Sequence, residues 1–142
     1  MKRHADARWT GDLKSGQGSL ALGSGAFQGA YSFASRFEDA GGTNPEELLG
    51  AAHAGCYSMA LALATATAGH IATSVETKAT VHLGQADGHP SITRIDLDCT
   101  AVVPGLSEAE FQMLAEATKS GCIVSQALSA VPMHLTAKLV SA

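Results

Sequence analysis

The fold of this chain is decided by residues 43–63, which read TNPEELLGAAHAGCYSMALAL. Asn44 can cap a helix, Pro45 suits the first helical position, and Glu47 falls where a capping box places its acid. No Asp, Glu, Lys or Arg then follows until Glu76. The stretch therefore predicts a long helix that needs burial on every side. Because it is rich in alanine and has few large apolar side chains, a buried helix is favoured over a membrane span.

The residues before this helix are rich in glycine and serine, and they predict a small meander of short strands, one of them at Gly18–Leu22. The segment Tyr31–Phe37 alternates with a period of two, which predicts a strand with its aromatic rings on one face. Arg36 is then expected on the other face, pointing away from the aromatic rings.

The residues after the helix show further alternating and capped segments. Alternation predicts strands at Val75–Leu83, Ile95–Ala101 and Met133–Val140, and a second capping box predicts a helix after Ser107. Gly121 indicates the end of that helix, so Cys122 falls at its junction with a short helix over Ile123–Leu128. The order of elements predicts an α+β fold: antiparallel sheets with a long central buried helix and a second helix packed on one face.

Composition narrows the class of protein. With 142 residues, 46% of them hydrophobic and 15% charged, the chain is expected to fold as one domain over residues 1–142. A net charge of −4 argues against nucleic acid as a partner, and none is expected. No apolar signal segment follows Met1, so a cytoplasmic location is expected, and no membrane association. Three cysteines in a reducing compartment favour redox or nucleophilic chemistry over a permanent disulfide framework.

Cys56 has the most unusual position of the three cysteines. A thiol inside an apolar helix is normally protonated and inert, because desolvation raises its pKa. Reactivity would need a nearby cation, and Arg36 is the available candidate. Simple packing is the ordinary explanation for such a cysteine. Gly55 shifts the balance, since a glycine inside a helix suggests close approach by another segment or a substrate. Cys99, on the apolar side of its predicted strand, is interpreted as a core residue.

His53 offers an alternative reading of the same helix. It precedes Cys56 by three residues and lies on the same face, which would allow a Cys-His hydrolase or acyl transferase. A metal site would need further ligands, and the chain has no C-x-x-C or H-x-x-x-H spacing. A buried, hydrogen-bonded core histidine is the favoured interpretation of His53.

Several segments together resemble the OsmC/Ohr family of thiol peroxidases, and specifically its OsmC branch. They are Trp9–Asp12, Phe33–Glu38, Gly42–Leu48, Ala51–Cys56, Gly121–Cys122 and Val124–Gln126. The resemblance covers nearly the whole chain, with one departure: Ile123 stands where the family usually has proline.

The resemblance implies a site and a mechanism. Cys56 would attack the peroxide, Cys122 would resolve the resulting sulfenic acid into a disulfide, Arg36 would hold thiolate and peroxide, and Glu46 would orient Arg36. It further implies an intertwined homodimer with two sites at its interface, reduction by an external dithiol such as a lipoyl group, and no metal or other cofactor. Apolar surroundings at Cys56 favour organic hydroperoxides, with hydrogen peroxide as a second substrate.

Helix geometry limits how this site can be built. Glu46 and Cys56 are ten residues apart, about 15 Å along a straight helix, too far for both to meet one guanidinium. Either the helix breaks at Gly50 or the site is shared between subunits, and sharing is favoured because a helix apolar on every side needs a partner to bury it. Besides the hydrolase, the remaining alternative is a non-enzymatic protein that binds an apolar ligand and has passive thiols.

Overall fold

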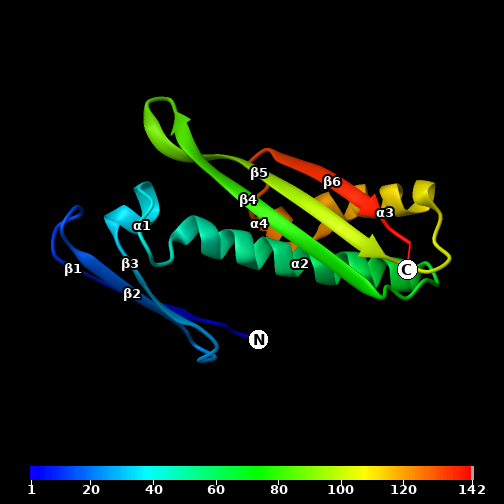
Figure 1. Cartoon of the computed structure of the whole chain (residues 1–142), viewed down its shortest axis with the longest axis horizontal. Coiled ribbons are helices and arrows are strands. Elements are labelled where there is room, and N and C mark those ends of the chain that lie inside the picture. The colour runs from blue at the N-terminus through cyan, green and yellow to red at the C-terminus, as the bar shows by residue number, and fades with distance from the viewer. Residues whose placement is uncertain (142) are drawn as a thin grey trace. The chain divides into compact units, whose positions relative to one another are not determined.

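The computed structural model describes residues 1–141 as two compact units (Figure 1). The first spans Met1–Leu48 and the second begins at Leu49, so the division falls inside a helix. The predicted α+β class is confirmed, because each unit combines a three-stranded sheet with helical segments. A single domain over residues 1–142 stays a prediction.

The first unit is built on an antiparallel sheet of β1 (Ala5–Thr10), β2 (Gln17–Leu22) and β3 (Gln28–Tyr31), in that order. Gly18, in the middle strand, pairs with Trp9 on one side and Tyr31 on the other. A Cβ at Gly18 would lie 2.3 Å from the Tyr31 ring. The glycine therefore leaves room for the two rings to meet across β2, with centroids 5.4 Å apart.

The predicted strand over residues 31–37 is wrong, because β3 ends at Tyr31 and a helix, α1 (Phe33–Phe37), follows. The cause is a reciprocal capping box: Ser32 Oγ accepts the Ser35 N–H at 3.1 Å, and Ser35 Oγ accepts the Ser32 N–H at 2.8 Å. The phenylalanines that begin and end α1 are four residues apart, with ring centroids 4.9 Å apart. A spacing of four fits a strand face and a helix face equally well, and the serine caps select the helix.

Helix α2 spans Pro45–Thr67 and begins at the predicted residue. The predicted cap is present, since Asn44 Oδ1 accepts the Glu47 N–H at 2.8 Å. The helix continues unbroken through Gly50, where an added Cβ would lie 3.1 Å from the Ala79 carbonyl oxygen. Gly50 therefore permits a close crossing with a strand, and the suggested break at this residue is wrong.

Only one face of α2 is buried in the chain. Residues four apart on that face have no exposed surface: His53, Tyr57, Leu61 and Thr65. On the opposite face Met59 is 77% exposed and Leu63 69% exposed. Within the single chain α2 is thus buried on one side, and its burial on every side would need a partner, as expected from the sequence. By length and composition alone α2 could also cross a membrane.

The second unit contains a sheet of β4 (Ser74–Ala86), β5 (His89–Val102) and β6 (Met133–Leu139), in that order. β4 and β5 form an antiparallel hairpin that turns at Asp87 and Gly88, both with positive φ. β6 pairs with β5 in parallel, so the prediction of purely antiparallel sheets is wrong here. The reason is the long connection between β5 and β6, whose two helices carry the chain back to the starting end of β5.

These two helices are α3 (Glu108–Gly121), capped by Ser107 as predicted, and α4 (Ile123–Ala127). The core of the second unit lies between α2, α3 and the apolar face of β5, as predicted for helices packed on one face of a sheet (Figure 1). Tyr57 ties α2 to α3 by donating its hydroxyl to the Ala115 carbonyl at 3.0 Å, and desolvation raises its pKa. Cys99 is 2% exposed within this core, which confirms its interpretation as a core residue.

Candidate active site

Arg36 and Glu46 form a hydrogen-bonded ion pair within the first unit. Arg36 Nη2 donates to Glu46 Oε1 at 2.7 Å, and Nε lies 3.2 Å from both carboxylate oxygens. The Glu46 side chain is 10% exposed, whereas that of Arg36 is 38% exposed. A nearly buried carboxylate therefore fixes one edge of a guanidinium whose other side stays accessible.

The local fold explains how Arg36 reaches this position. It lies in the last turn of α1, and Glu46 lies in the first turn of α2. The expectation that Arg36 points away from the aromatic rings is wrong, because its Cζ lies 5.2 Å from the centroid of the Phe37 ring. The ring therefore adds a cation–π contact to the fixed orientation of the guanidinium.

Cys56 lies on α2, within the second unit, as a free and half-buried cysteine that packs against the core. Within the second unit, no segment other than the surrounding turns of α2 has an atom within 4 Å of where a Cβ on Gly55 would be. That side of the helix beside Cys56 is open to a substrate or to another molecule.

Cys122 lies at the predicted junction, where it ends α3 and caps α4. It is 2% exposed, yet its sulfur has polar neighbours. Cys122 Sγ accepts the Ser125 N–H at 3.3 Å and lies 3.1 Å from Ser125 Oγ. Ile123, which replaces the proline usual in the family, is 79% exposed and leaves this cap intact.

His53 is the buried core histidine that the sequence favoured. Its Nε2 lies 2.8 Å from Ser125 Oγ, while its Nδ1 is buried with no hydrogen-bond partner among residues 1–141. Desolvation lowers the pKa of His53 below its ordinary value of 6.5, so the ring is neutral at neutral pH. Ser125 belongs to a segment that carries the family resemblance, but no local pattern links it to a histidine 72 residues away.

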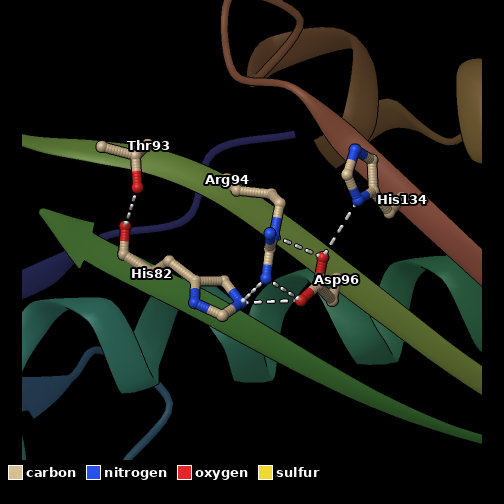
Figure 2. Close-up of polar contacts among 5 residues, drawn as sticks. All are labelled: His82, Thr93, Arg94, Asp96 and His134. Atoms are coloured by element: carbon tan, nitrogen blue, oxygen red, sulfur yellow. Dashed lines mark hydrogen bonds and ion pairs between the residues drawn. The ribbon is translucent and has the colours of Figure 1, made fainter. Parts of the chain in front are cut away.

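Sequence inspection also missed a polar cluster on the face of the sheet away from the core (Figure 2). His82 Nε2 lies 2.7 Å from Asp96 Oδ2, and Arg94 Nε lies 2.9 Å from Asp96 Oδ1, with His134 Nδ1 at 3.7 Å from the same oxygen. Burial raises the pKa of Asp96, but the hydrogen bonds with His82 and Arg94 outweigh it and leave the pKa below its ordinary value. Within residues 1–141, no three or more His, Cys, Asp or Glu side chains are grouped so that they could hold a metal ion.

Of the four predicted site residues, the structure brings one pair into contact, Arg36 and Glu46 in the first unit. Cys56 and Cys122 both lie in the second unit, where Cys122 contacts Ser125 and Ser125 contacts His53. The chain therefore combines an α+β fold, a guanidinium held in one orientation and free cysteines. These features define a class of proteins suited to thiol chemistry.

Comparison with known proteins identifies the family within this class. The family model for OsmC-like proteins matches residues 38–136. Peroxiredoxin OsmC of Escherichia coli K12 is 45% identical over 131 residues, which cover 92% of each chain. The chain therefore belongs to the OsmC family.

Solved structures share the fold. An OsmC-like protein from Mycoplasma pneumoniae has a TM-score of 0.75 at 18% identity, covering 99% of this chain and 98% of the other. An organic hydroperoxide resistance protein from Elizabethkingia anophelis has a TM-score of 0.72 at 23% identity, covering 99% of both chains. At these identities the likeness establishes the fold alone.

Proposed function

We propose that this chain is a thiol peroxidase that reduces organic hydroperoxides, and hydrogen peroxide as well, with Cys56 as the attacking thiolate and Cys122 as the resolving thiol. Its membership of the OsmC family makes it an oxidoreductase that detoxifies peroxides. The observation that carries the mechanism is the Arg36–Glu46 pair, because a fixed and accessible guanidinium is what a thiolate and a peroxide both require.

The chemistry balances in two steps. The Cys56 thiolate attacks one peroxide oxygen, so an S–O bond forms, the O–O bond breaks, and the alkoxide leaves as an alcohol after taking a proton. Cys122 then attacks the Cys56 sulfur, so an S–S bond forms and the S–O bond breaks with release of water. An external dithiol of the lipoyl type returns both cysteines to thiols by disulfide exchange, and no bound cofactor takes part.

The continuous helix α2 supports a site shared by two subunits. Glu46, which holds Arg36, is ten residues and about 15 Å along this helix from Cys56, and Gly50 does not break it. In our proposal Arg36 of one subunit serves Cys56 of its partner within an intertwined homodimer. The exposed apolar face of α2, with Met59 and Leu63, supplies a surface for the partner to cover. Both thiols would be kept reduced in the cytoplasm.

The direct test is to treat the reduced protein with cumene hydroperoxide and identify the paired cysteines by mass spectrometry. A Cys56–Cys122 disulfide is expected, with Cys99 remaining a thiol. A disulfide that involves Cys99, or peroxide consumption that leaves Cys122 unpaired, contradicts the mechanism. A stable monomer with full activity in sedimentation experiments contradicts the shared site.

Arg36→Lys tests the role of the guanidinium. An ammonium cannot reproduce the fork held by Glu46, so the rate of sulfenic acid formation at Cys56 should fall roughly ten- to a hundredfold. Stopped-flow kinetics with cumene hydroperoxide measures this rate. Arg94→Lys is the matched control, because Arg94 also pairs with a carboxylate but belongs to the cluster around Asp96, on the face of the second unit's sheet away from its core. Equal losses in both variants would remove Arg36 from the mechanism.

The alternatives make different predictions. A Cys-His hydrolase would accumulate an acyl-enzyme at Cys56 with an activated ester, and a passive binding protein would consume no peroxide with any dithiol. The hydrolase is disfavoured because the Nε2 of His53 is bonded to Ser125, and no hydrogen bond joins His53 to Cys56 in the part of the chain that the structure describes.

A further inference from the structure

A chain of three polar groups crosses the core of the second unit beside the resolving thiol. His53 Nε2 lies 2.8 Å from Ser125 Oγ, which lies 3.1 Å from Cys122 Sγ. The three residues are 0%, 3% and 2% exposed, so no bulk water reaches these links. They join α2 to the start of α4, where the Cys122 sulfur also accepts the Ser125 N–H as the cap of that helix.

Such a chain is expensive to bury unless each group has a partner. One group does not: His53 Nδ1 has no hydrogen-bond partner among the described residues. An apolar side chain would fill the same space without this cost. The arrangement therefore points to a use for the imidazole beyond packing.

We propose that Ser125 and His53 form a proton relay that removes the proton from Cys122 when this thiol resolves the Cys56 sulfenic acid. The inference rests on the proposed function of Cys122. With the ring in its Nδ1–H form, the thiol donates to Ser125 Oγ and the serine hydroxyl donates to His53 Nε2. Both heavy-atom separations are within hydrogen-bond reach, which is what proton transfer requires.

The step balances with one proton moved and one water released. The Cys122 proton passes to Ser125 Oγ as the serine proton passes to His53 Nε2. The Cys122 sulfur then attacks the Cys56 sulfur, the S–S bond forms, and the S–O bond breaks to give hydroxide. The hydroxide takes up one proton to make water, and His53 Nε2 gives up the proton that it accepted, so the proton lost by Cys122 is accounted for in the water released. The Ser125 N–H, 3.3 Å from Cys122 Sγ, supports the transient thiolate.

Ser125 and His53 are thus positioning residues that act through Cys122, and their loss should slow one step only. In a single turnover with cumene hydroperoxide, dimedone trapping reports sulfenic acid at Cys56, and mass spectrometry follows the Cys56–Cys122 disulfide. Ser125→Ala should leave sulfenic acid formation unchanged and slow disulfide formation roughly a hundredfold. Ser125→Thr, which keeps the hydroxyl, should restore the rate.

His53→Gln separates proton acceptance from hydrogen bonding. Its amide reaches Ser125 but cannot take a proton at neutral pH, so disulfide formation should slow as in Ser125→Ala. Thr65→Val is the matched control. It removes a different fully buried hydroxyl, which lies on α2 and donates only to the Ala62 carbonyl. Its disulfide rate should equal that of the unaltered protein. Circular dichroism of each variant checks folding.

The outcomes separate this inference from the proposed function. If the unaltered protein forms no Cys56–Cys122 disulfide, both are overturned. If it does, and Ser125→Ala and His53→Gln form the disulfide at the same rate, only the relay is overturned. An unchanged rate in His53→Gln with a slow rate in Ser125→Ala likewise rejects His53 as the proton acceptor.

Discussion

Cys99 and Cys122 are equally buried, at 2% exposure each, but their surroundings differ. Cys99 lies in the middle of β5 with its sulfur in the apolar core, and desolvation raises its pKa more than the neighbouring Thr77 lowers it. Cys122 lies between two helices, where a backbone N–H and a serine hydroxyl reach its sulfur. Equal burial thus leaves the two sulfurs in different polar surroundings, and in our proposal the thiol at the helix junction is the one that reacts.

The largest expected difference between the two cysteines is in turnover. Cys122→Ser should abolish the intramolecular disulfide and the dithiol-driven reduction of cumene hydroperoxide, because in our proposal Cys122 is the thiol that condenses with the Cys56 sulfenic acid. Cys99→Ser should retain both. Peroxide consumption with dihydrolipoate as reductant measures the effect. Loss of turnover in Cys99→Ser together with its survival in Cys122→Ser would reverse the assignment.

The same two substitutions should also differ in the free energy of unfolding. This difference should be smaller than the one in turnover, and here Cys99→Ser should be the more damaging change. A hydroxyl at position 99 enters an apolar core where its hydrogen-bonding neighbour, Thr77, already accepts from Ser58, so Cys99→Ser should cost about 1–3 kcal/mol. A hydroxyl at position 122 inherits the contacts with Ser125 and should cost less than about 1 kcal/mol. Urea unfolding under reducing conditions measures both. Equal costs would mean that the surroundings of the two sulfurs are energetically alike.

The sequence predicted the elements that carry their own local signals. Three such features depend on only a few consecutive residues each: the cap at Asn44, the cap at Ser107 and the junction at Cys122. The structure confirms all three. The strand predicted over residues 31–37 was wrong because its two phenylalanines are four residues apart, a spacing that puts them on one face of either a strand or a helix. The short serine capping box between β3 and α1 was the deciding signal, and it was not recognised.

What the sequence could not predict depends on residues far apart in the chain. The parallel direction of β6 follows from the path of the helices before it, and the cluster around Asp96 follows from the register of three strands. The contact of His53 with Ser125 needs α2 and α4 to be packed together. Cys56, Cys122, Arg36 and Glu46 were assigned roles through family resemblance, and those roles stay predictions. The pairing of Arg36 with Glu46 is a contact that the structure contains.

The smallest expected effect concerns stability in acid. Unlike Cys99, Cys122 is linked through Ser125 to a titratable group, His53. Desolvation lowers the pKa of His53 in the folded state below 6.5, so below that pH the unfolded chain binds a proton that the folded chain resists. The stability is therefore complete above about pH 6.5 and declines as the pH falls through the folded-state pKa. His53→Gln should lack this component of the decline, whereas Thr65→Val should lower stability by the same amount at every pH. Urea unfolding at several pH values between 5 and 8, roughly the range in which histidines titrate, measures the slopes. If His53→Gln and the unaltered protein lose stability in parallel on acidification, His53 is not held neutral by its burial, and the link from Cys122 does not end in a free proton acceptor.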